Sequence, residues 1–265
     1  MYIINNIPNL LTLFNLLCGC IAIVFASTNN LIWSAYMVGF ACVFDFLDGL
    51  VARLLKANSE LGKQLDSLAD MVSFGVVPGV IMYKMILYSQ ILASFTDVIK
   101  KTILALGEEN NLLQHVPEVF HLNILAITGF LITIFSAIRL AKYNIDTRQG
   151  NSFIGLPTPA NAIFIASIPL IPYASLPILS EIITPYFLVS LTFISSFFLI
   201  APIHFFAIKF KNFLWTDNKI RYIFLALSLS LLILFKFAGI PLIIILYIIL
   251  SIINNIVTRN KTQQS

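Results

Sequence analysis

Charged residues are scarce in this chain of 265 residues. Asp, Glu, Lys and Arg together make up 11% of it, whereas a soluble globular domain carries about 25%. Hydrophobic residues make up 59%, and the mean hydropathy is +0.93. This composition excludes an ordinary soluble protein and indicates a polytopic membrane protein. The formal net charge is only +4, and we expect no nucleic-acid partner.

Cysteine is also rare, and its positions exclude a disulfide framework. Cys18, Cys20 and Cys42 all lie inside apolar runs, and three cysteines cannot pair evenly. We interpret them as packing residues. The N-terminal segment MYIINNIPN has no basic residue, and the first apolar run has no Ala-x-Ala-like site after it. We therefore expect a retained helix and not a signal peptide.

Long apolar runs dominate what is present. A membrane-spanning helix needs about 20 apolar residues, and the fold class that follows is an all-α polytopic membrane protein with about eight transmembrane helices. The predicted spans are 8–27, 32–53, 66–90, 121–142, 157–176, 183–203, 220–238 and 240–258. Gly239 and Pro241 predict a tight turn between the last two.

Lysine and arginine favour one side of these spans. They follow the second, fourth, sixth and eighth spans, at Arg53, Lys56, Lys63, Arg139, Lys142, Arg148, Lys209, Lys211, Lys219, Arg221, Arg259 and Lys261. The opposite loops hold only Lys84, Lys100, Lys101 and Lys236. Because cytoplasmic loops are enriched in Lys and Arg, this asymmetry predicts an even number of spans in the cytoplasmic membrane, with both termini cytoplasmic.

Residues 91–120 form an insert between the third and fourth spans. Its first half, ILASFTDVIKKTILAL, has apolar residues at near-helical spacing, and GEENN then breaks the pattern. The pattern predicts an amphipathic helix lying on the outer surface. A dimer contact is the alternative.

Four aspartates stand together in the segment FDFLDGLVARLLKANSELGKQLDSLADMVSFG. Asp45 and Asp48 are three residues apart, and Asp66 and Asp70 are four apart, so each pair shares one face of its helix. An acidic side chain within a membrane is costly and by default marks function. A turn around 57–59 makes the two helices antiparallel, so that their acidic faces oppose each other at the cytoplasmic side.

Carboxylates alone suit a hard cation, Mg²⁺ or Mn²⁺. The cluster has no His or Cys, which makes zinc a poor match. Mg²⁺ typically joins carboxylates to substrate phosphates, so the natural chemistry is transfer at phosphorus. Four carboxylates could hold one or two metals, and they could also leave one carboxylate free to act as general base. Salt bridges between the helices are the alternative, but nearby cations are too few: Arg53, Lys56 and Lys63.

The pattern Asp45-x2-Asp48-Gly49-x2-Ala52-Arg53-x8-Gly62-x3-Asp66-x3-Asp70 resembles the full signature of the CDP-alcohol phosphatidyltransferases. The resemblance implies that the four aspartates surround divalent metal and that Asp70 deprotonates the acceptor hydroxyl. It further implies a nucleotide pocket lined by Gly49, Ala52, Arg53 and Gly62, with contributions from Asn9 and Thr12.

Flanking segments extend the likeness to the membrane-embedded branch that makes phosphatidylserine in bacteria. They are IPNLLTLFNLLCGCIAI at 7–23, residues 60–79, SAIRLAKYN at 136–144 and FIGLPTPANA at 153–162. This resemblance implies a catalytic domain over residues 1–205, built from the first six helices and containing the insert, with an additional C-terminal helix pair over 206–265. The implied substrates are CDP-diacylglycerol and L-serine, and the implied assembly is a homodimer.

Further candidates concern the acceptor or a phosphate. Arg139 lies within an apolar run near its cytoplasmic end, where a guanidinium can hold a phosphate or carboxylate through two hydrogen bonds. Lys142 follows it, and positive-inside anchoring is the alternative for both. Less specific polar candidates are Ser73, Thr158 and Asn161.

Two other functions stay open. A sister enzyme would use another acceptor, such as glycerol 3-phosphate or inositol, and a phosphorylated acceptor would want more cations than Arg139 and Lys142 supply. A cation-coupled transporter is the alternative from another class, but its acids usually lie near the bilayer midplane.

Overall fold

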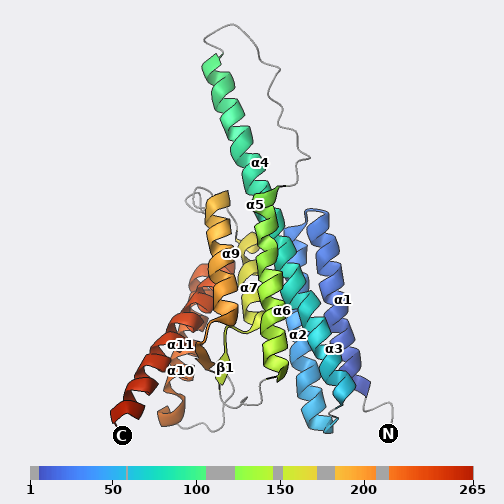
Figure 1. Ribbon diagram of the computed structural model, residues 1–265, viewed down its shortest axis with the longest axis vertical. Coiled ribbons are helices and arrows are strands. Elements are labelled where there is room, and N and C mark those ends of the chain that lie inside the picture. Colours follow the sequence, from blue (N-terminus) through green and yellow to red (C-terminus); the bar gives the residue numbers. More distant parts are fainter. Residues whose placement is uncertain are drawn as a thin grey trace.

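The computed structural model describes residues 6–57, 59–105, 123–145, 152–171, 183–206 and 215–264. They form a bundle of helices that run mainly along its long axis (Figure 1). The predicted cationic positions Arg148, Lys209 and Lys211 lie outside the described residues, as do positions 106–120 of the insert.

The first three helices carry the acidic segment. Helix α1 (Ile7–Ser27) packs antiparallel against α2 (Leu31–Leu55), which ends where Lys56 adopts a left-handed conformation, φ 51°. Helix α3 (Glu60–Asp70) then begins, and its N-cap Ser59 accepts a hydrogen bond from the backbone of Gly62 at 3.0 Å. Such a cap satisfies one of the unpaired N–H groups at a helix start.

Helix α3 continues without a break into a π-helical segment and then into α4. The π-helix η2 (Met71–Val76) starts directly after Asp70, and α4 (Val77–Ala105) follows. Residues 91–105 of the insert are therefore helical, as predicted. They prolong α4, which projects beyond the bundle (Figure 1), so the expectation of a separate helix lying on the outer surface was wrong.

The middle of the chain supplies shorter helices. Helix α5 (Ile124–Ile127) passes through the 3-10 turn η3 (Thr128–Phe130) into α6 (Leu131–Ile145). Helix α7 (Thr158–Ser167) is extended by the 3-10 turn η4 (Ile168–Leu170). Together these elements occupy the predicted fourth span and most of the fifth.

The remaining helices complete the bundle and add a hairpin. Helix α9 (Pro185–Ile200) packs on α4 and α6. Helix α10 (Trp215–Phe235) and helix α11 (Gly239–Gln264) pack against each other. The turn η6 (Lys236–Ala238), where φ of Lys236 is 51°, connects them. The predicted turn near Gly239 is confirmed.

A two-stranded ribbon joins the hairpin to the rest of the bundle, and sequence analysis did not predict it. Strand β1 (Ser152–Ile154) pairs antiparallel with β2 (His204–Phe206), with Phe153 opposite Phe205. Strands of three residues are too short to show the alternation of apolar and polar residues by which strands are recognised. The fold is otherwise all-α among the described residues.

Composition and length mark four helical stretches as able to cross a membrane. They are Ile7–Ser27, Glu60–Phe95, Ile124–Ile145 and Asn218–Val257, and the last contains both arms of the C-terminal hairpin. The apolar stretches Thr158–Leu170 and Pro185–Ile200 are shorter. These stretches make the chain an integral membrane protein, while the predicted count of eight spans goes beyond what they establish.

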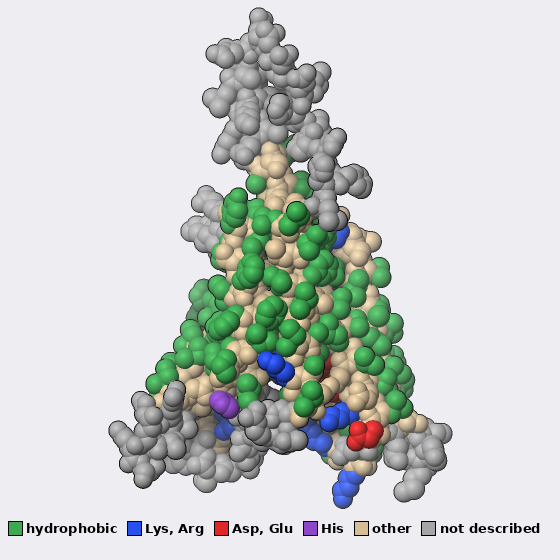
Figure 2. Space-filling model, viewed as in Figure 1, with side chains coloured by type: hydrophobic (Ala, Val, Ile, Leu, Met, Phe, Trp, Pro, Cys, Tyr) green, Lys and Arg blue, Asp and Glu red, His purple; other side chains and the backbone are tan. Residues whose placement is uncertain are grey.

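The outer surface agrees with this membrane character. Figure 2 shows hydrophobic side chains over the middle of the visible face, with most of its charged side chains toward the lower end. The buried core lies where α1, α2, α4, α7 and α9 meet, around Phe74, Ile81, Met82 and Ile165. The three cysteines are free, and Cys18 and Cys42 pack in this core as predicted. Cys20 is exposed, so its prediction as a packing residue was wrong.

Candidate active site

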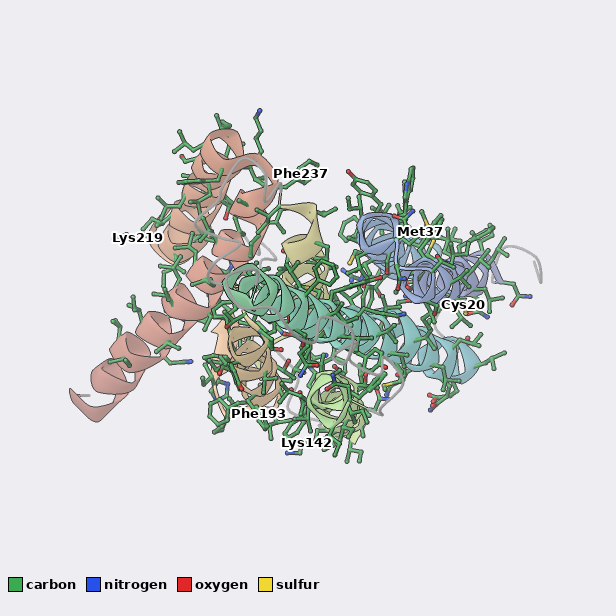
Figure 3. The ribbon with its side chains drawn as sticks, turned by 90° about the horizontal axis from the view of Figure 1, so that it is seen from above. Cys20, Met37, Lys142, Phe193, Lys219 and Phe237 are labelled. Atoms are coloured by element: carbon green, nitrogen blue, oxygen red, sulfur yellow. The ribbon has the colours of Figure 1, made fainter. Side chains whose placement is uncertain are left out.

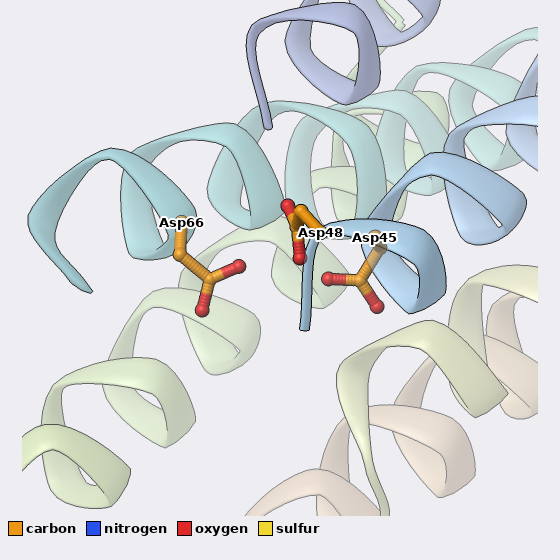
Figure 4. A group of neighbouring side chains, drawn as sticks. All are labelled: Asp45, Asp48 and Asp66. Atoms are coloured by element: carbon orange, nitrogen blue, oxygen red, sulfur yellow. The ribbon is translucent and has the colours of Figure 1, made fainter. Parts of the chain in front are cut away.

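Three of the four predicted aspartates converge. Carboxylate oxygens of Asp45 and Asp48 on α2 and of Asp66 on α3 lie within 4.8 Å of one another. Figure 4 shows the three side chains directed into the space between their two helices. Asp48 is buried, and the other two are half-buried. Helical spacing brings two of them together on α2, and the turn after Lys56 brings in the third, so the predicted opposition of acidic faces is confirmed.

The fourth aspartate lies beside this triad. Asp70 ends α3 one turn after Asp66, and its carboxyl group is close enough to interact with that of Asp45. The amide nitrogen Nδ2 of Asn15 on α1 donates to Asp70 Oδ1 at 3.3 Å. The π-helix begins at the next residue, and such local widening of a helix is frequent at functional sites.

Helix α1 supplies polar side chains that hold the acidic ones. The Thr12 hydroxyl donates to Asp48 Oδ2 at 2.7 Å, and Thr12 is itself buried. The hydroxyl of Ser73 donates to the backbone oxygen of Asn15 at 2.9 Å, which ties η2 to α1. Thus Thr12 contacts an acidic side chain, whereas Ser73 lies buried in a contact between helices.

The small residues of the predicted nucleotide pocket lie along the same helices. A Cβ on Gly62 would come within 2.8 Å of Asn9 Oδ1, so Asn9 packs directly on this glycine. A Cβ on Gly49 would meet Nη2 of Arg53 at 3.5 Å, so the exposed Arg53 side chain folds back over Gly49. Ala52 is half-buried on the same helix.

Arg139 on α6 is buried, with 8% of its surface exposed. Its Nη1 donates to the Thr158 hydroxyl at 3.2 Å, and its guanidinium carbon lies 5.3 Å from the centre of the Tyr143 ring. Its Nε has no hydrogen-bond partner among the described residues. A buried guanidinium with an unused N–H group is costly unless an anion binds it, so Arg139 has the features of an anion-binding residue.

Asn161 adds a second unused donor. It lies three residues after Thr158, on the same face of α7, and is fully buried. Its Oδ1 accepts from Ser195 at 3.0 Å, while its Nδ2 is without a hydrogen-bond partner in the described part of the chain. Lys142, in contrast, is exposed and extends from the periphery of the bundle (Figure 3).

Several features of the site were not found by sequence reasoning. Tyr143, one turn after Arg139, packs on the guanidinium, and the i, i+4 spacing could have suggested it. The contact of Asn15 with Asp70 was not predicted either, since it joins residues 55 positions apart on different helices.

The donor set of the triad suits a divalent metal. Three carboxylates close together repel each other, and the described residues place no lysine or arginine in ion-pair contact with them. The alternative of salt bridges between the helices therefore finds no support there. Oxygen-only ligands are the type that Mg²⁺ or Mn²⁺ prefers.

Comparison with known proteins identifies the family. The profile of the CDP-alcohol phosphatidyltransferases matches residues 5–257. The chain is 33% identical over 160 residues to a CDP-diacylglycerol–serine O-phosphatidyltransferase of Helicobacter pylori strain J99 and 33% identical over 156 residues to one of Bacillus subtilis. It is 29% identical over 163 residues to an archaetidylserine synthase of Methanothermobacter thermautotrophicus.

These alignments cover similar shares of this chain but different shares of the relatives. They include 60%, 58% and 61% of this chain, and 54%, 70% and 56% of the respective relatives. The chain thus spans about half the length of the Helicobacter and Methanothermobacter proteins. The profile match over nearly all of the sequence, together with the acidic triad, shows that this chain belongs to the CDP-alcohol phosphatidyltransferase family.

Proposed function

We propose that the protein transfers the phosphatidyl group of CDP-diacylglycerol to the hydroxyl of L-serine, which gives phosphatidylserine and CMP. The observation that carries this proposal is the acidic triad of Asp45, Asp48 and Asp66 beside Asp70, in a chain of this family. The relatives named as serine transferases support the choice of acceptor.

On the donor side, the three aspartates would hold Mg²⁺ or Mn²⁺, with Asp70 at the edge of the same site. When bound, the metal would neutralise charge on the diphosphate of the donor. Gly49, Ala52 and Gly62 would line the cytidine pocket together with Arg53, because the three small residues let a nucleotide approach the backbone closely. Asn9 lies against Gly62 and would border the same pocket. Thr12, which holds Asp48, would act mainly through that carboxylate.

On the acceptor side, Arg139 would bind the serine carboxylate. Its unused Nε and the unused Nδ2 of Asn161 are both donors, which suits an anion better than a cation. Thr158 fixes one arm of the guanidinium. Lys142 and Ser73 are weaker candidates, since Lys142 is exposed and the Ser73 hydroxyl is already donated to α1.

The reaction then needs one proton transfer and one displacement. Asp70 accepts the proton of the serine hydroxyl, and the serine oxygen bonds to the phosphorus that carries the diacylglycerol. The bond from that phosphorus to the bridging oxygen of the diphosphate breaks, and CMP leaves with this oxygen. The Asn15 amide, which donates to Asp70 Oδ1, orients the carboxylate for this step.

In the membrane we propose eight spans, with the active site and both termini at the cytoplasmic face. Helix α1 begins and α11 ends at the same end of the molecule as the turn between α2 and α3 (Figure 1), as an even number of passes requires. We propose the cytoplasmic membrane as the location, a catalytic domain over 1–205, and a helix pair over 206–265. The homodimer remains a prediction from the family resemblance.

A sister enzyme with another acceptor is the nearest alternative, since the family also includes such enzymes. An acceptor panel tests the choice. Purified protein receives CDP-diacylglycerol, Mg²⁺, and serine, glycerol 3-phosphate or inositol in turn, and CMP and lipid products are measured. We expect CMP release with serine and little with the other two. Preference for another acceptor would refute serine as the substrate, and absence of CMP release with every acceptor would favour the transporter alternative.

A further inference from the structure

Helix α11 covers one edge of strand β2. The Tyr247 hydroxyl donates to the backbone oxygen of Phe206 at 2.9 Å, and Nδ2 of Asn255 donates to the backbone oxygen of His204 at 2.9 Å. Two residues of one helix, eight positions apart, thus hold alternate carbonyl groups of the strand. The Tyr247 contact is buried, where an unpaired carbonyl group is costly, whereas the Asn255 contact is exposed. Together the two contacts hold β2 against α11.

The other side of this strand holds the segment that leads into α7. The backbone N–H of Gly155 donates to the oxygen of Ile203 at 3.0 Å, and that of Leu156 donates to the oxygen of Phe198 at 2.9 Å. Gly155 has φ +80°, and a Cβ there would strike the carbonyl oxygen of Leu199. Since carbonyl directions alternate along a strand, the groups bonded to α11 face away from this segment. Strand β2 therefore lies between α11 and the chain entering α7.

This segment ends at the residue that holds Arg139. Thr158, the first residue of α7, is three positions after Gly155, and its hydroxyl accepts from Arg139 Nη1 at 3.2 Å. Tyr247 also packs on the rings of Phe205 and Phe206, with centroids 5.5 and 5.0 Å away. A shift of β2 on α11 would therefore move Thr158 relative to the guanidinium.

We propose that Tyr247 and Asn255 are positioning residues of the acceptor site, which act through the β-ribbon and Thr158 on Arg139. The C-terminal hairpin is then part of the machinery for acceptor binding and not an appendage to the catalytic domain. This inference rests on the proposed function, in which Arg139 binds the acceptor carboxylate.

The first test compares Tyr247→Phe and Asn255→Ala with Ser251→Ala. Ser251 lies between them on α11, is fully buried, and its hydroxyl has no hydrogen-bond partner among the described residues, which makes it a matched control. Loss of one such hydrogen bond should raise the serine KM about 3- to 10-fold. The donor KM and kcat should stay near wild type, and Ser251→Ala should change neither of them nor the serine KM. The Tm in detergent should fall in Tyr247→Phe, because this variant leaves a buried carbonyl group of β2 without its partner.

The second test is a double-mutant cycle with Thr158→Val. If Tyr247 acts through Thr158, Tyr247→Phe should have little further effect in the Thr158→Val background, because coupled residues are not additive. If the factors by which Tyr247→Phe and Thr158→Val each raise the KM multiply fully in the double variant, the two residues are independent and the inference is wrong. The inference would also be wrong if Tyr247→Phe raised the serine KM and Asn255→Ala did not. The Tyr247 hydroxyl would then act on Arg139 without the ribbon.

The same cycle separates this inference from the proposed function. Coupling between Tyr247 and Thr158 supports the positioning role whichever KM changes. If the coupled change appears in the donor KM, the positioning role stands, but Arg139 binds the donor phosphate and its assignment to serine is wrong.

Discussion

The hydrogen bond from Thr12 to Asp48 allows a quantitative test of the proposed metal site. Valine at position 12 keeps the shape of threonine but removes the hydroxyl that donates at 2.7 Å to a buried carboxylate. A hydrogen bond to a charged group contributes about 1.5–3 kcal/mol. Groups that orient a metal ligand typically change metal affinity about 10- to 100-fold, which corresponds to about 1.4–2.7 kcal/mol, so the two estimates agree.

We therefore expect Thr12→Val to raise the Mg²⁺ concentration for half-maximal activity about 10- to 100-fold. The assay measures CMP release against Mg²⁺ at saturating donor and acceptor. Thr192→Val is the matched control, because Thr192 is also a buried helical threonine. Its hydroxyl donates to the Leu188 carbonyl four residues earlier and has no carboxylate partner among the described residues. An unchanged Mg²⁺ requirement in Thr12→Val would refute the role of Asp48 as a metal ligand.

Three further predictions concern other parts of the molecule. Asp70→Asn should keep donor affinity but lose about 10²–10⁴ in turnover, the contribution of one positioned base; near-normal turnover would assign the base elsewhere. Arg139→Lys should raise the serine KM far more than the donor KM, because lysine lacks the two-armed guanidinium; a change confined to the donor KM would place Arg139 at the lipid phosphate. Gly155→Ala should lower the Tm in detergent through strain at φ +80° and the clash with Leu199. Gly39→Ala should not, because the added Cβ would meet no neighbouring atom within 4 Å among the described residues; equal Tm values would contradict the described turn.

The acidic triad could be predicted from the sequence because its geometry is local. Asp45 and Asp48 share a helix face by spacing alone, and one short turn places Asp66 on the neighbouring helix. A reader of the sequence needs only helical periodicity and an antiparallel pair to bring these three together. The finer difference between the triad and Asp70 depends on side-chain placement, which spacing does not determine.

The surroundings of Arg139 depend on tertiary structure. Its burial follows from its place in an apolar run, but its partner Thr158 is 19 positions away and begins a different helix. Strand β1, which precedes Thr158, pairs with another three-residue strand about 50 positions later in the chain. This ribbon contacts Tyr247 on α11, a helix to which sequence reasoning assigned no catalytic role. No local pattern carries such information.

The insert illustrates the same limit. Residues 91–105 have a helical pattern, and they are helical. Whether such a helix turns onto a surface or prolongs the preceding one depends on the junction near residue 90. That junction holds no proline or glycine that would break the helix, which is a signal that could have favoured one continuous α4.

Formation of phosphatidylserine by metal-stripped and metal-restored protein tests the central claim most directly. Purified protein is treated with EDTA, freed of the chelator, and supplied with CDP-diacylglycerol and L-serine. We expect no phosphatidylserine without added metal, and equal amounts of phosphatidylserine and CMP once Mg²⁺ or Mn²⁺ is added, but not with Zn²⁺. Full turnover in excess EDTA, or metal-dependent CMP release without phosphatidylserine, would contradict the account.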